Sequence, residues 1–300
     1  MARATYELIE CKSALNKVQN MGFGWSLNPY RGCVHACMYC YARANHLHLG
    51  LNAAEDFETQ LFVKTNFVEV LRRELARPGW KREEVAIGTA TDPYQPIEGK
   101  YQLTKGAVTA LADFATPAHI VTKSPLVIRD IDELRRLDEQ AGVRVCLTIT
   151  TLDEAIWRVM EPGTAPPKQR IRALSMLATA GVPCGIFFAP VLPRLTDGEE
   201  AMRSLMQAAK DAGASFVWSG PLRLGADIRP IYLSAIEQHY PELLDRYERN
   251  YRRADAPMAY RDFLRARIHK IRDEVGLSGE GARPKPRHLE DEPQQLALAV

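Results

Sequence analysis

Three cysteines close together near the N-terminus are the residues best suited to chemistry. Cys33, Cys37 and Cys40 lie four and three residues apart, and the aromatic Tyr39 precedes the last of them. With this spacing, one tight loop can present three thiolates to a compact metal centre. Iron–sulfur cubanes are held by cysteine thiolates, and three thiolates leave one iron of a [4Fe-4S] cluster without a protein ligand. The sequence therefore predicts a cluster with one iron free to bind a small molecule.

Two other interpretations of the cysteines remain open. A structural zinc site could add His35, His46 or His48 to the same three thiolates, although zinc sites usually combine two separated pairs of ligands. A disulfide framework is less favoured. Six cysteines in 300 residues, three of them isolated along the chain, do not have the density of a stapled secreted domain.

The cysteine loop matches the CxxxCx(aromatic)C pattern of the radical S-adenosylmethionine (SAM) enzymes. Around it, residues 25–33 and 39–43 resemble the spore photoproduct lyase branch of that superfamily, also called DNA repair photolyase-like. Further matches to the branch are IGTATDPYQP at 87–96, TKS at 122–124 and EPGTAP at 161–166. The likeness extends from about Trp25 to about Leu224.

The resemblance implies two cofactors, a [4Fe-4S] cluster and SAM. The open iron would chelate the methionine amino and carboxylate groups of SAM, and an electron from a donor such as flavodoxin or ferredoxin would release a 5'-deoxyadenosyl radical. The cofactors supply the difficult chemistry, and the protein supplies binding and orientation. The branch points to a lyase-like repair or modification of a nucleic-acid base in DNA. Radical modification of a small metabolite, a peptide or a tRNA is one alternative, and a non-enzymatic metal-binding protein is another.

By resemblance, several residues are expected to bind SAM. Tyr39 would lie near the adenine, and Lys123, at the end of an apolar strand, would pair with the methionine carboxylate. The loop with Thr89, Thr91 and Asp92 would approach the amino group, and Thr148 would reach the ribose. A lysine that ends an apolar strand is poorly explained by packing, whereas the threonines are equally well explained by their preference for strands.

Catalytic and substrate-binding candidates surround this site. Tyr39 and Tyr41 flank the last cysteine, where the lyase branch has tyrosines associated with a hydrogen-transfer relay. The lyase also carries a hydrogen-donating cysteine after its second strand, but residues 88–91 contain none. Tyr94, Arg194 and Arg223 are expected to contact the substrate from loops that follow strands. The segment 158–162 with Arg170 is expected to form a structural ion pair at least as readily as a binding site.

Six short apolar segments alternate with helical patterns, which predicts the parallel sheet of an α/β fold. We expect strands at 25–28, 85–89, 119–122, 143–149, 182–188 and 214–218, and helices at 41–49, 65–76, 104–114, 128–137, 171–177 and 201–212. Six strands match the partial (β/α)6 barrel of TIM type that the resemblance implies. In such barrels the chemistry lies on loops after the strands, which is where the cysteine loop falls.

Four regions are expected along the chain. They are an irregular N-terminal arm at 1–24, the barrel at 25–228, a helical extension at 229–276 and a mobile tail at 277–300 whose apolar end at 294–300 docks or frays. The extension is rich in Arg, Glu and Tyr and should contain two or three amphipathic helices. Its basic residues form either a solvated face or a stripe that contacts phosphates, with Tyr247, Tyr251 and Tyr260 available to stack on bases.

The overall composition is that of an ordinary globular protein. The chain is 46% hydrophobic and 25% charged, with a net charge of +2 that neither requires nor excludes a nucleic-acid partner. It contains no apolar run of about 18 residues and no signal sequence. We therefore expect a cytoplasmic enzyme with no membrane association, in a compartment where thiols stay reduced.

Overall fold

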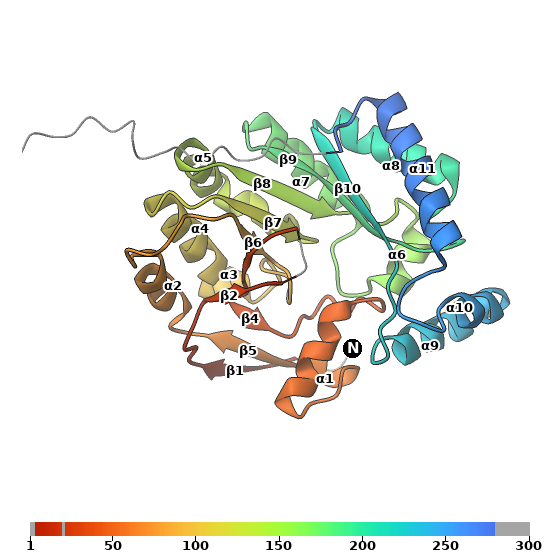
Figure 1. The fold of residues 1–300 in the computed structure, drawn as a ribbon, viewed down its shortest axis with the longest axis horizontal. Helices are drawn as coiled ribbons and strands as arrows, with labels where there is room; N and C mark the ends of the chain where they lie inside the picture. The colour runs from red at the N-terminus through yellow and green to blue at the C-terminus, as the bar shows by residue number, and fades with distance from the viewer. Residues whose placement is uncertain (1–3, 20–21, 280–300) are drawn as a thin grey trace, which may run out of the picture.

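The computed structural model describes residues 4–19 and 22–279 and is built around a seven-stranded sheet (Figure 1). The order across the sheet is β10-β9-β8-β7-β6-β3-β2. Six parallel strands follow one another in chain order: β3 (Trp25–Leu27), β6 (Val85–Ile87), β7 (Ala118–Thr122), β8 (Val143–Thr148), β9 (Cys184–Val191) and β10 (Phe216–Pro221). Because β10 and β2 are the sheet's two edges, the barrel is partial. All six expected strands are present, and the fold is the expected partial (β/α)6 barrel.

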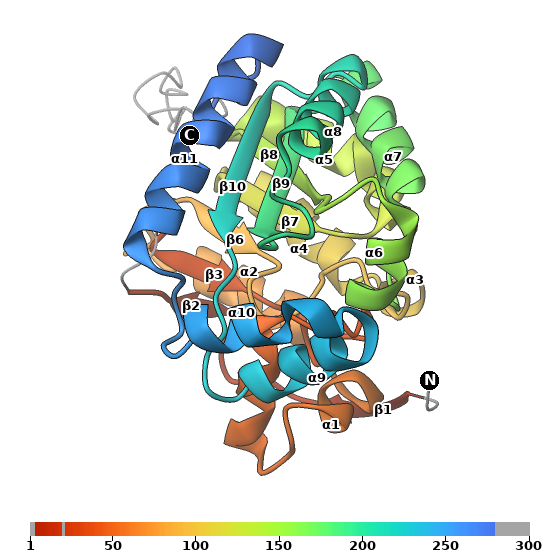
Figure 2. The same ribbon diagram turned by 90° about the vertical axis from the view of Figure 1, so that its right-hand side faces the viewer.

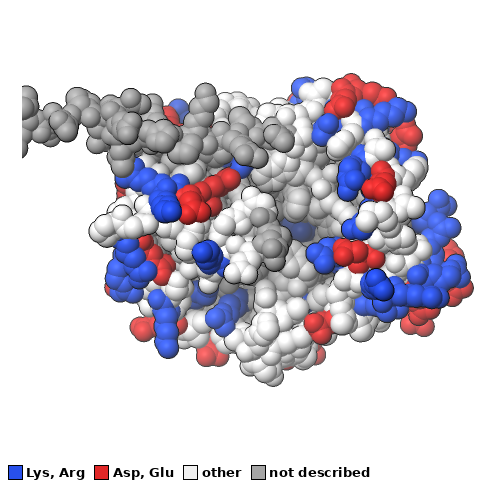
Figure 3. Space-filling view, viewed as in Figure 1, with Lys and Arg blue, Asp and Glu red and all other residues white. Residues whose placement is uncertain are grey.

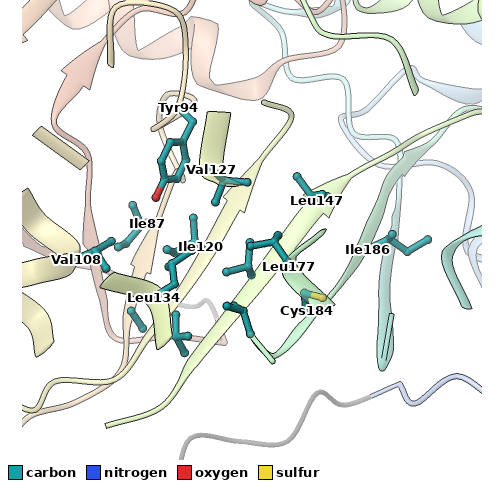
Figure 4. Close-up of a cluster of buried hydrophobic side chains, with 14 of the residues drawn as sticks. Ile87, Tyr94, Val108, Ile120, Val127, Leu134, Leu147, Leu177, Cys184 and Ile186 are labelled. Carbon is teal, nitrogen blue, oxygen red and sulfur yellow. The ribbon is translucent and has the colours of Figure 1, made fainter. Parts of the chain in front are cut away.

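The main hydrophobic core lies between this sheet and the helices outside it. These helices are α2 (Phe67–Leu75), α4 (Leu103–Asp113), α5 (Ile131–Gln140), α7 (Pro167–Thr179) and α8 (Glu199–Asp211). Side chains alternate between the two faces of a strand, so Ile87, Ile120 and Leu147 point toward the helices, where Val108 and Leu134 lie (Figure 4). The residues between them point into the barrel.

The helices expected from periodicity are also present. Residues 41–49 form a 3₁₀-helix, η1 (Tyr41–Leu49), which ends at Gly50 in the left-handed conformation. Shorter helices occupy the loops after β6, β7 and β8: α3 (Glu98–Tyr101), η2 (Pro125–Asp130) and α6 (Glu154–Met160). No helix in the described part of the chain is long and apolar enough to cross a membrane.

The N-terminal segment is more regular than expected. It contains β1 (Thr5–Ile9) and β2 (Leu15–Lys17), and β2 extends the barrel sheet by pairing antiparallel with β3. A second sheet has the order β1-β5-β4, with β4 (Tyr30–Arg31) and β5 (Gln60–Lys64), and α1 (Glu55–Thr59) precedes β5. The prediction of an irregular arm is wrong for these strands. Their side chains are mostly exposed, so the apolar alternation that identifies a strand is missing.

The C-terminal extension consists of α9 (Arg229–His239), η3 (Pro241–Leu243), α10 (Leu244–Asn250) and α11 (Met258–Val275). α11 lies along α8 and β10, whereas α9 and α10 lie beyond the carboxyl ends of the strands (Figure 2). Leu277 is buried, and Ser278 pairs with Phe216 of β10. Leu277 and Ser278 therefore pack on the barrel, and they are not part of a mobile tail as expected. Residues 280–300 lie outside the described part, and the four-region division itself stays a prediction.

Candidate active site at the cysteine loop

The cysteines lie in a tight loop between β4 and η1. Cys33 and Cys37 are buried, and Cys40 is partly exposed. The Cys40 amide donates to the Cys37 carbonyl at 3.2 Å. Gly32 begins the loop with a φ of 77°, and a Cβ there would lie 2.9 Å from the Phe57 carbonyl. Only glycine satisfies both demands, so the local sequence fixes the start of the loop.

Arg43 supports the loop from the side of η1. This buried guanidinium donates to the Cys37 carbonyl at 3.0 Å and to the Ala54 carbonyl at 2.7 Å. It also pairs with Glu58 at 2.7 Å and lies over the Phe57 ring. A fully buried arginine is rare unless it is paired. This role of Arg43 was not predicted from the sequence, although Arg43 falls within the segment that resembles the lyase branch.

The loop after β6 supports the cysteine loop from a second side. The Thr91 hydroxyl donates to the Gly32 carbonyl at 2.6 Å, and the side-chain amide of Gln95 donates to the same carbonyl at 3.1 Å. Gln95 also accepts from the Val34 amide at 3.3 Å. Thr89 accepts from the Asn28 amide at 3.1 Å. The threonines expected to bind SAM thus lie at the site, and their hydroxyls already bind the protein.

Asp92 links the cysteine loop to β7. Its carboxylate accepts from the Thr122 hydroxyl and the Lys123 amide, each at 2.7 Å, and lies 3.2 Å from His35 Nδ1. Burial alone would raise the pKa of this carboxyl, but His35 and these hydrogen bonds hold it at about 2. Asp92 is therefore a charged support of the loop, and its oxygens are occupied by the protein.

A third support comes from the EPGTAP segment after α6. The Gly163 amide of this segment donates to the His35 carbonyl at 3.1 Å, and just before the segment the carbonyl of Met160, the last residue of α6, accepts from the Met38 amide at 3.0 Å. A Cβ on Gly163 would lie 2.1 Å from the Val34 carbonyl. The EPGTAP segment and the cysteine loop are thus in direct backbone contact.

Glu161, in the same segment, anchors a buried polar network. Its carboxylate accepts from the Tyr39 hydroxyl and, at 2.8 Å, from the Thr150 hydroxyl. Arg170 pairs with it at 2.5 Å, which confirms the expected structural ion pair. Burial alone would raise the pKa of the Glu161 carboxyl, but Arg170 and Lys123 hold it at about 2. The contact of Glu161 with Tyr39 was not predicted from the sequence.

Lys123 stands at the carboxyl end of β7 with its ammonium facing the cysteine loop. Its Nζ lies 5.5 Å from the centre of the Tyr39 ring. Burial alone would lower its pKa, but Cys37 and Glu161 raise it. Within the described residues, Nζ has no hydrogen bond or ion pair within contact distance, whereas the backbone amide of Lys123 is bound to Asp92. The ammonium is therefore free to bind an anionic group.

The two tyrosines beside Cys40 differ in environment. Tyr39 is buried, and its hydroxyl is occupied by Glu161. Tyr41 is 61% exposed, and its hydroxyl donates to the Thr89 carbonyl. Of the two phenols, that of Tyr41 is the accessible one.

Thr148, at the end of β8, is buried on the strand face opposite Leu147, and its carbonyl accepts from Arg170 at 3.0 Å.

One substrate-binding expectation is wrong. Tyr94 has 0% of its surface exposed and belongs to the main core, beside Ile87 and Val127 in Figure 4. Gly88, directly after β6, has a φ of 94°, and a Cβ there would lie 2.9 Å from Pro93 Cδ of the following loop. Polar neighbours in the sequence made this loop look exposed, but a fully buried ring cannot reach a substrate.

The other two substrate candidates are exposed on loops after β9 and β10. Arg194 points to solvent, and Arg223 is 68% exposed and pairs with Asp255 at 2.9 Å. Tyr247 of α10 donates to the Pro193 carbonyl at 2.6 Å, which brings the extension beside these loops.

Basic side chains continue from these loops over the extension. Figure 3 shows this face hollowed near its middle, with Lys and Arg side chains gathered over α10. We call the exposed residues Arg194, Arg246, Arg252 and Arg253 the basic rim. Tyr247 and Tyr251 are buried, so the expectation that their rings stack on bases is wrong. Tyr260 is partly buried, and its hydroxyl donates to Asp197 at 3.0 Å.

The donor set fits an iron–sulfur cluster. Three thiols share one tight loop, and a free ammonium faces it. No three His, Cys, Asp or Glu side chains within 4–19 and 22–279 form a group that could hold one metal ion; a cubane instead binds each thiolate at a separate iron. His35 and His46, candidates for the zinc alternative, contact Asp92 and the Gln60 carbonyl. All six cysteines are free, as expected for a chain without a disulfide framework.

A partial α/β barrel that carries a three-cysteine loop at the carboxyl ends of its strands defines a class of iron–sulfur enzymes. The chain belongs to the radical SAM superfamily, whose family model matches residues 27–206, more than half of its length. Enzymes of this superfamily use a [4Fe-4S] cluster and SAM, and these are the cofactors of this chain.

Individual relatives extend the comparison. An uncharacterized protein of Mycobacterium tuberculosis is 41% identical over 290 residues, which cover 95% of this chain and 85% of the relative. A protein of Pseudomonas phage M6 named radical SAM Nalpha-GlyT isomerase is 22% identical, with 71% of this chain and 42% of the relative covered. The solved structure of spore photoproduct lyase complexed with dinucleoside spore photoproduct superposes with a TM-score of 0.69 at 18% identity, covering 91% of this chain and 80% of that one. The chain therefore has a lyase-like fold.

Proposed function

We propose that this enzyme cleaves SAM reductively and uses the resulting radical on a nucleic-acid base in DNA. The observation that carries the SAM part is the free ammonium of Lys123 beside Cys37 and the Tyr39 ring. When bound, the cluster and SAM supply a 5'-deoxyadenosyl radical, which abstracts a hydrogen atom. All other tasks, namely binding, orientation and exclusion of water, fall to the protein.

In this proposal each site residue has a task. Cys33, Cys37 and Cys40 bind three irons, and Lys123 pairs with the methionine carboxylate. Thr148 contributes its hydroxyl to the ribose because its side chain points into the barrel, away from the face of Leu147. Thr89, Thr91 and Asp92 act chiefly through the cysteine loop that they support, and Tyr39 offers its ring to the adenine.

Tyr41 is the proposed hydrogen relay. It is exposed at the mouth of the barrel and is tied to the Thr89 carbonyl, which fixes its ring beside Cys40. Because residues 88–91 contain no cysteine, the proposed reaction does not include the lyase's own hydrogen donor. We propose base repair or modification as the reaction class, with the lesion or base left open.

The basic rim supports a nucleic-acid substrate. Arg246, Arg252 and Arg253 have no ion-pair partner in the described part of the chain, unlike Arg223 and Arg249, which pair with Asp255 and Asp245. Arginines contact phosphates strongly through paired hydrogen bonds. The solved structure with a similar fold is a lyase complexed with a dinucleoside photoproduct, which is consistent with this choice. A metabolite, peptide or tRNA is the competing substrate class.

The test begins with anaerobic reconstitution of the protein with iron and sulfide. After dithionite and SAM are added, 5'-deoxyadenosine is measured with and without an ultraviolet-damaged DNA duplex. We expect product from the wild type, none from Cys40→Ala, and more product when the duplex is present. Stoichiometric zinc with no cluster would instead mean that the loop is structural. Product that the duplex leaves unchanged, but that a tRNA or metabolite pool increases, would move the substrate to the competing class.

We further propose that a flavodoxin or ferredoxin of the cytoplasm supplies the electron. The six free thiols are consistent with a reducing compartment. Replacement of dithionite by a reduced flavodoxin should sustain turnover.

A further inference from the structure

A buried carboxylate with no assigned role lies between the cysteine loop and Lys123. We propose that Glu161 is a positioning residue: by holding the Tyr39 hydroxyl it fixes the ring against which the Lys123 ammonium lies, and so determines where that ammonium meets the carboxylate of SAM. This inference rests on the proposed role of Lys123.

Tyr39 is held at both ends. Its hydroxyl donates to Glu161, and the amide of the preceding residue, Met38, donates to the Met160 carbonyl at 3.0 Å. Glu161 itself is 1% exposed and is fixed by Thr150 and Arg170. A side chain whose hydrogen-bond partner is itself fixed has little freedom to rotate. The Tyr39 ring is therefore a rigid surface in the site.

The position of Lys123 depends on that surface. The lysine stem has four carbons and many rotamers, and within the described residues no hydrogen bond fixes its Nζ. The contact at 5.5 Å from the Tyr39 ring and the nearby negative charge of Glu161 are what direct the ammonium. Loss of the Glu161 carboxylate would free the Tyr39 ring to move and would also remove the negative charge that orients the Lys123 ammonium.

The charges of Arg170, Lys123 and Glu161 sum to one net positive charge, which one bound anion would neutralise. Arg170 and Lys123 bring two positive charges, and Glu161 brings one negative charge. A buried excess charge is unfavourable unless it is paired, so a ligand carboxylate completes the balance. Electrostatics alone would therefore predict that removing the Glu161 charge tightens the binding of SAM. A positioning role predicts the opposite, and the two can be told apart.

The experiment compares Glu161→Gln and Tyr39→Phe in the cluster-loaded protein. Tyr39→Phe removes only the hydroxyl contact and leaves the Glu161 charge paired with Arg170. The measurements are the Kd for SAM, the iron content, and the electron paramagnetic resonance spectrum of the reduced cluster with and without SAM. The matched control is Glu154→Gln, which removes a carboxylate of the preceding helix α6 that pairs at the surface with Arg158.

We expect both variants to keep wild-type iron content and to bind SAM about five- to tenfold more weakly, the size of one ordinary hydrogen bond. Their SAM-dependent spectral change should be reduced accordingly, whereas Glu154→Gln should match the wild type. Unchanged or tighter SAM binding in Glu161→Gln would overturn the inference. If Glu161→Gln fails to load the cluster, Tyr39→Phe decides in the same way.

A double-mutant cycle tests whether the effect passes through Lys123. In a Lys123→Ala background, Glu161→Gln should weaken SAM binding no further, because the group that it positions is gone. A full additional loss would mean that Glu161 acts by another route. Wild-type SAM affinity in Lys123→Ala alone would instead remove the proposed role of Lys123, so the two failures are distinguishable.

Discussion

Lys123 is the residue whose replacement best separates cofactor binding from the integrity of the loop. Lys123→Ala removes a free ammonium but leaves the backbone amide that binds Asp92 in place. We expect the variant to load its cluster normally and to bind SAM about 10- to 100-fold more weakly, since charge-assisted contacts to a partly buried carboxylate are worth about 1.5–3 kcal/mol. Titration of SAM into the reconstituted protein checks this. Lys168→Ala, at an exposed position of α7, is the control.

At the level of single residues, the sequence predicts the groups that have a local pattern. Cys33, Cys37 and Cys40 are recognisable from their spacing alone. Gln95 and Glu161 are not, because their partners Gly32 and Tyr39 lie 63 and 122 residues away along the chain. Arg43 has nearby partners, but no local pattern in the sequence indicates that its guanidinium is buried. For Tyr94 the prediction was wrong: its polar neighbours in the sequence indicated an exposed loop, but the fold buries its ring completely.

The EPGTAP segment gives a prediction for an element. Gly163→Ala would place a Cβ 2.1 Å from the Val34 carbonyl, and this backbone carbonyl cannot move away without displacing the cysteine loop. We expect lower iron incorporation and a loss of about 1–3 kcal/mol in the free energy of unfolding, as in overpacked cores. Gly99→Ala is the matched control because nothing lies within 4 Å of its Cβ position. Iron analysis and denaturant unfolding provide the two measurements.

Among the elements, the strands with continuous apolar side chains were predictable and the exposed ones were not. β8 is buried along its whole length and reads as a strand without ambiguity. β1 is mostly exposed, and its pairing with β5 joins segments more than fifty residues apart. Register and pairing of this kind depend on tertiary contacts, which explains why the N-terminal strands were missed.

For the whole molecule, the basic rim predicts salt-dependent binding of DNA. We expect the affinity for a duplex to fall as the salt concentration rises, and the slope of log K against log salt to shrink by about 1–2 in the Arg252→Gln/Arg253→Gln variant, because each phosphate contact contributes about 0.9. Fluorescence anisotropy between low and moderate salt measures both slopes. Arg135→Gln/Arg172→Gln, which changes the outer helices, should leave the slope as in the wild type. Salt-independent binding would contradict the nucleic-acid proposal.

Acid sensitivity is predicted at the opposite end of the barrel. Glu84, just before β6, pairs with His119 at 3.2 Å and with Arg144. Burial alone would raise the pKa of this carboxyl, but those partners lower it from 4.5 to about 2. Because the folded pKa is the lower one, the stabilisation is complete above pH 4.5 and is lost as the pH falls toward 2.

Glu84→Gln should remove this contribution. We expect a loss of about 1–3 kcal/mol at neutral pH and a flatter dependence of stability on pH below 4.5, measured by denaturant unfolding at several pH values. Glu69→Gln, at an exposed position of α2, is the control. An unchanged acid dependence in Glu84→Gln would assign the sensitivity to other carboxyl groups.

Cys37 and Tyr39 pack in one hydrophobic cluster with Tyr232, Tyr247 and Tyr251 of the extension. We therefore expect the cysteine loop and the helices of the basic rim to unfold as one cooperative unit. A ligand that binds only the folded state stabilises every part of such a unit. Binding of the [4Fe-4S] cluster should accordingly slow amide hydrogen exchange in α9 and α10. Exchange in these helices would then report on cofactor loading before any substrate has bound.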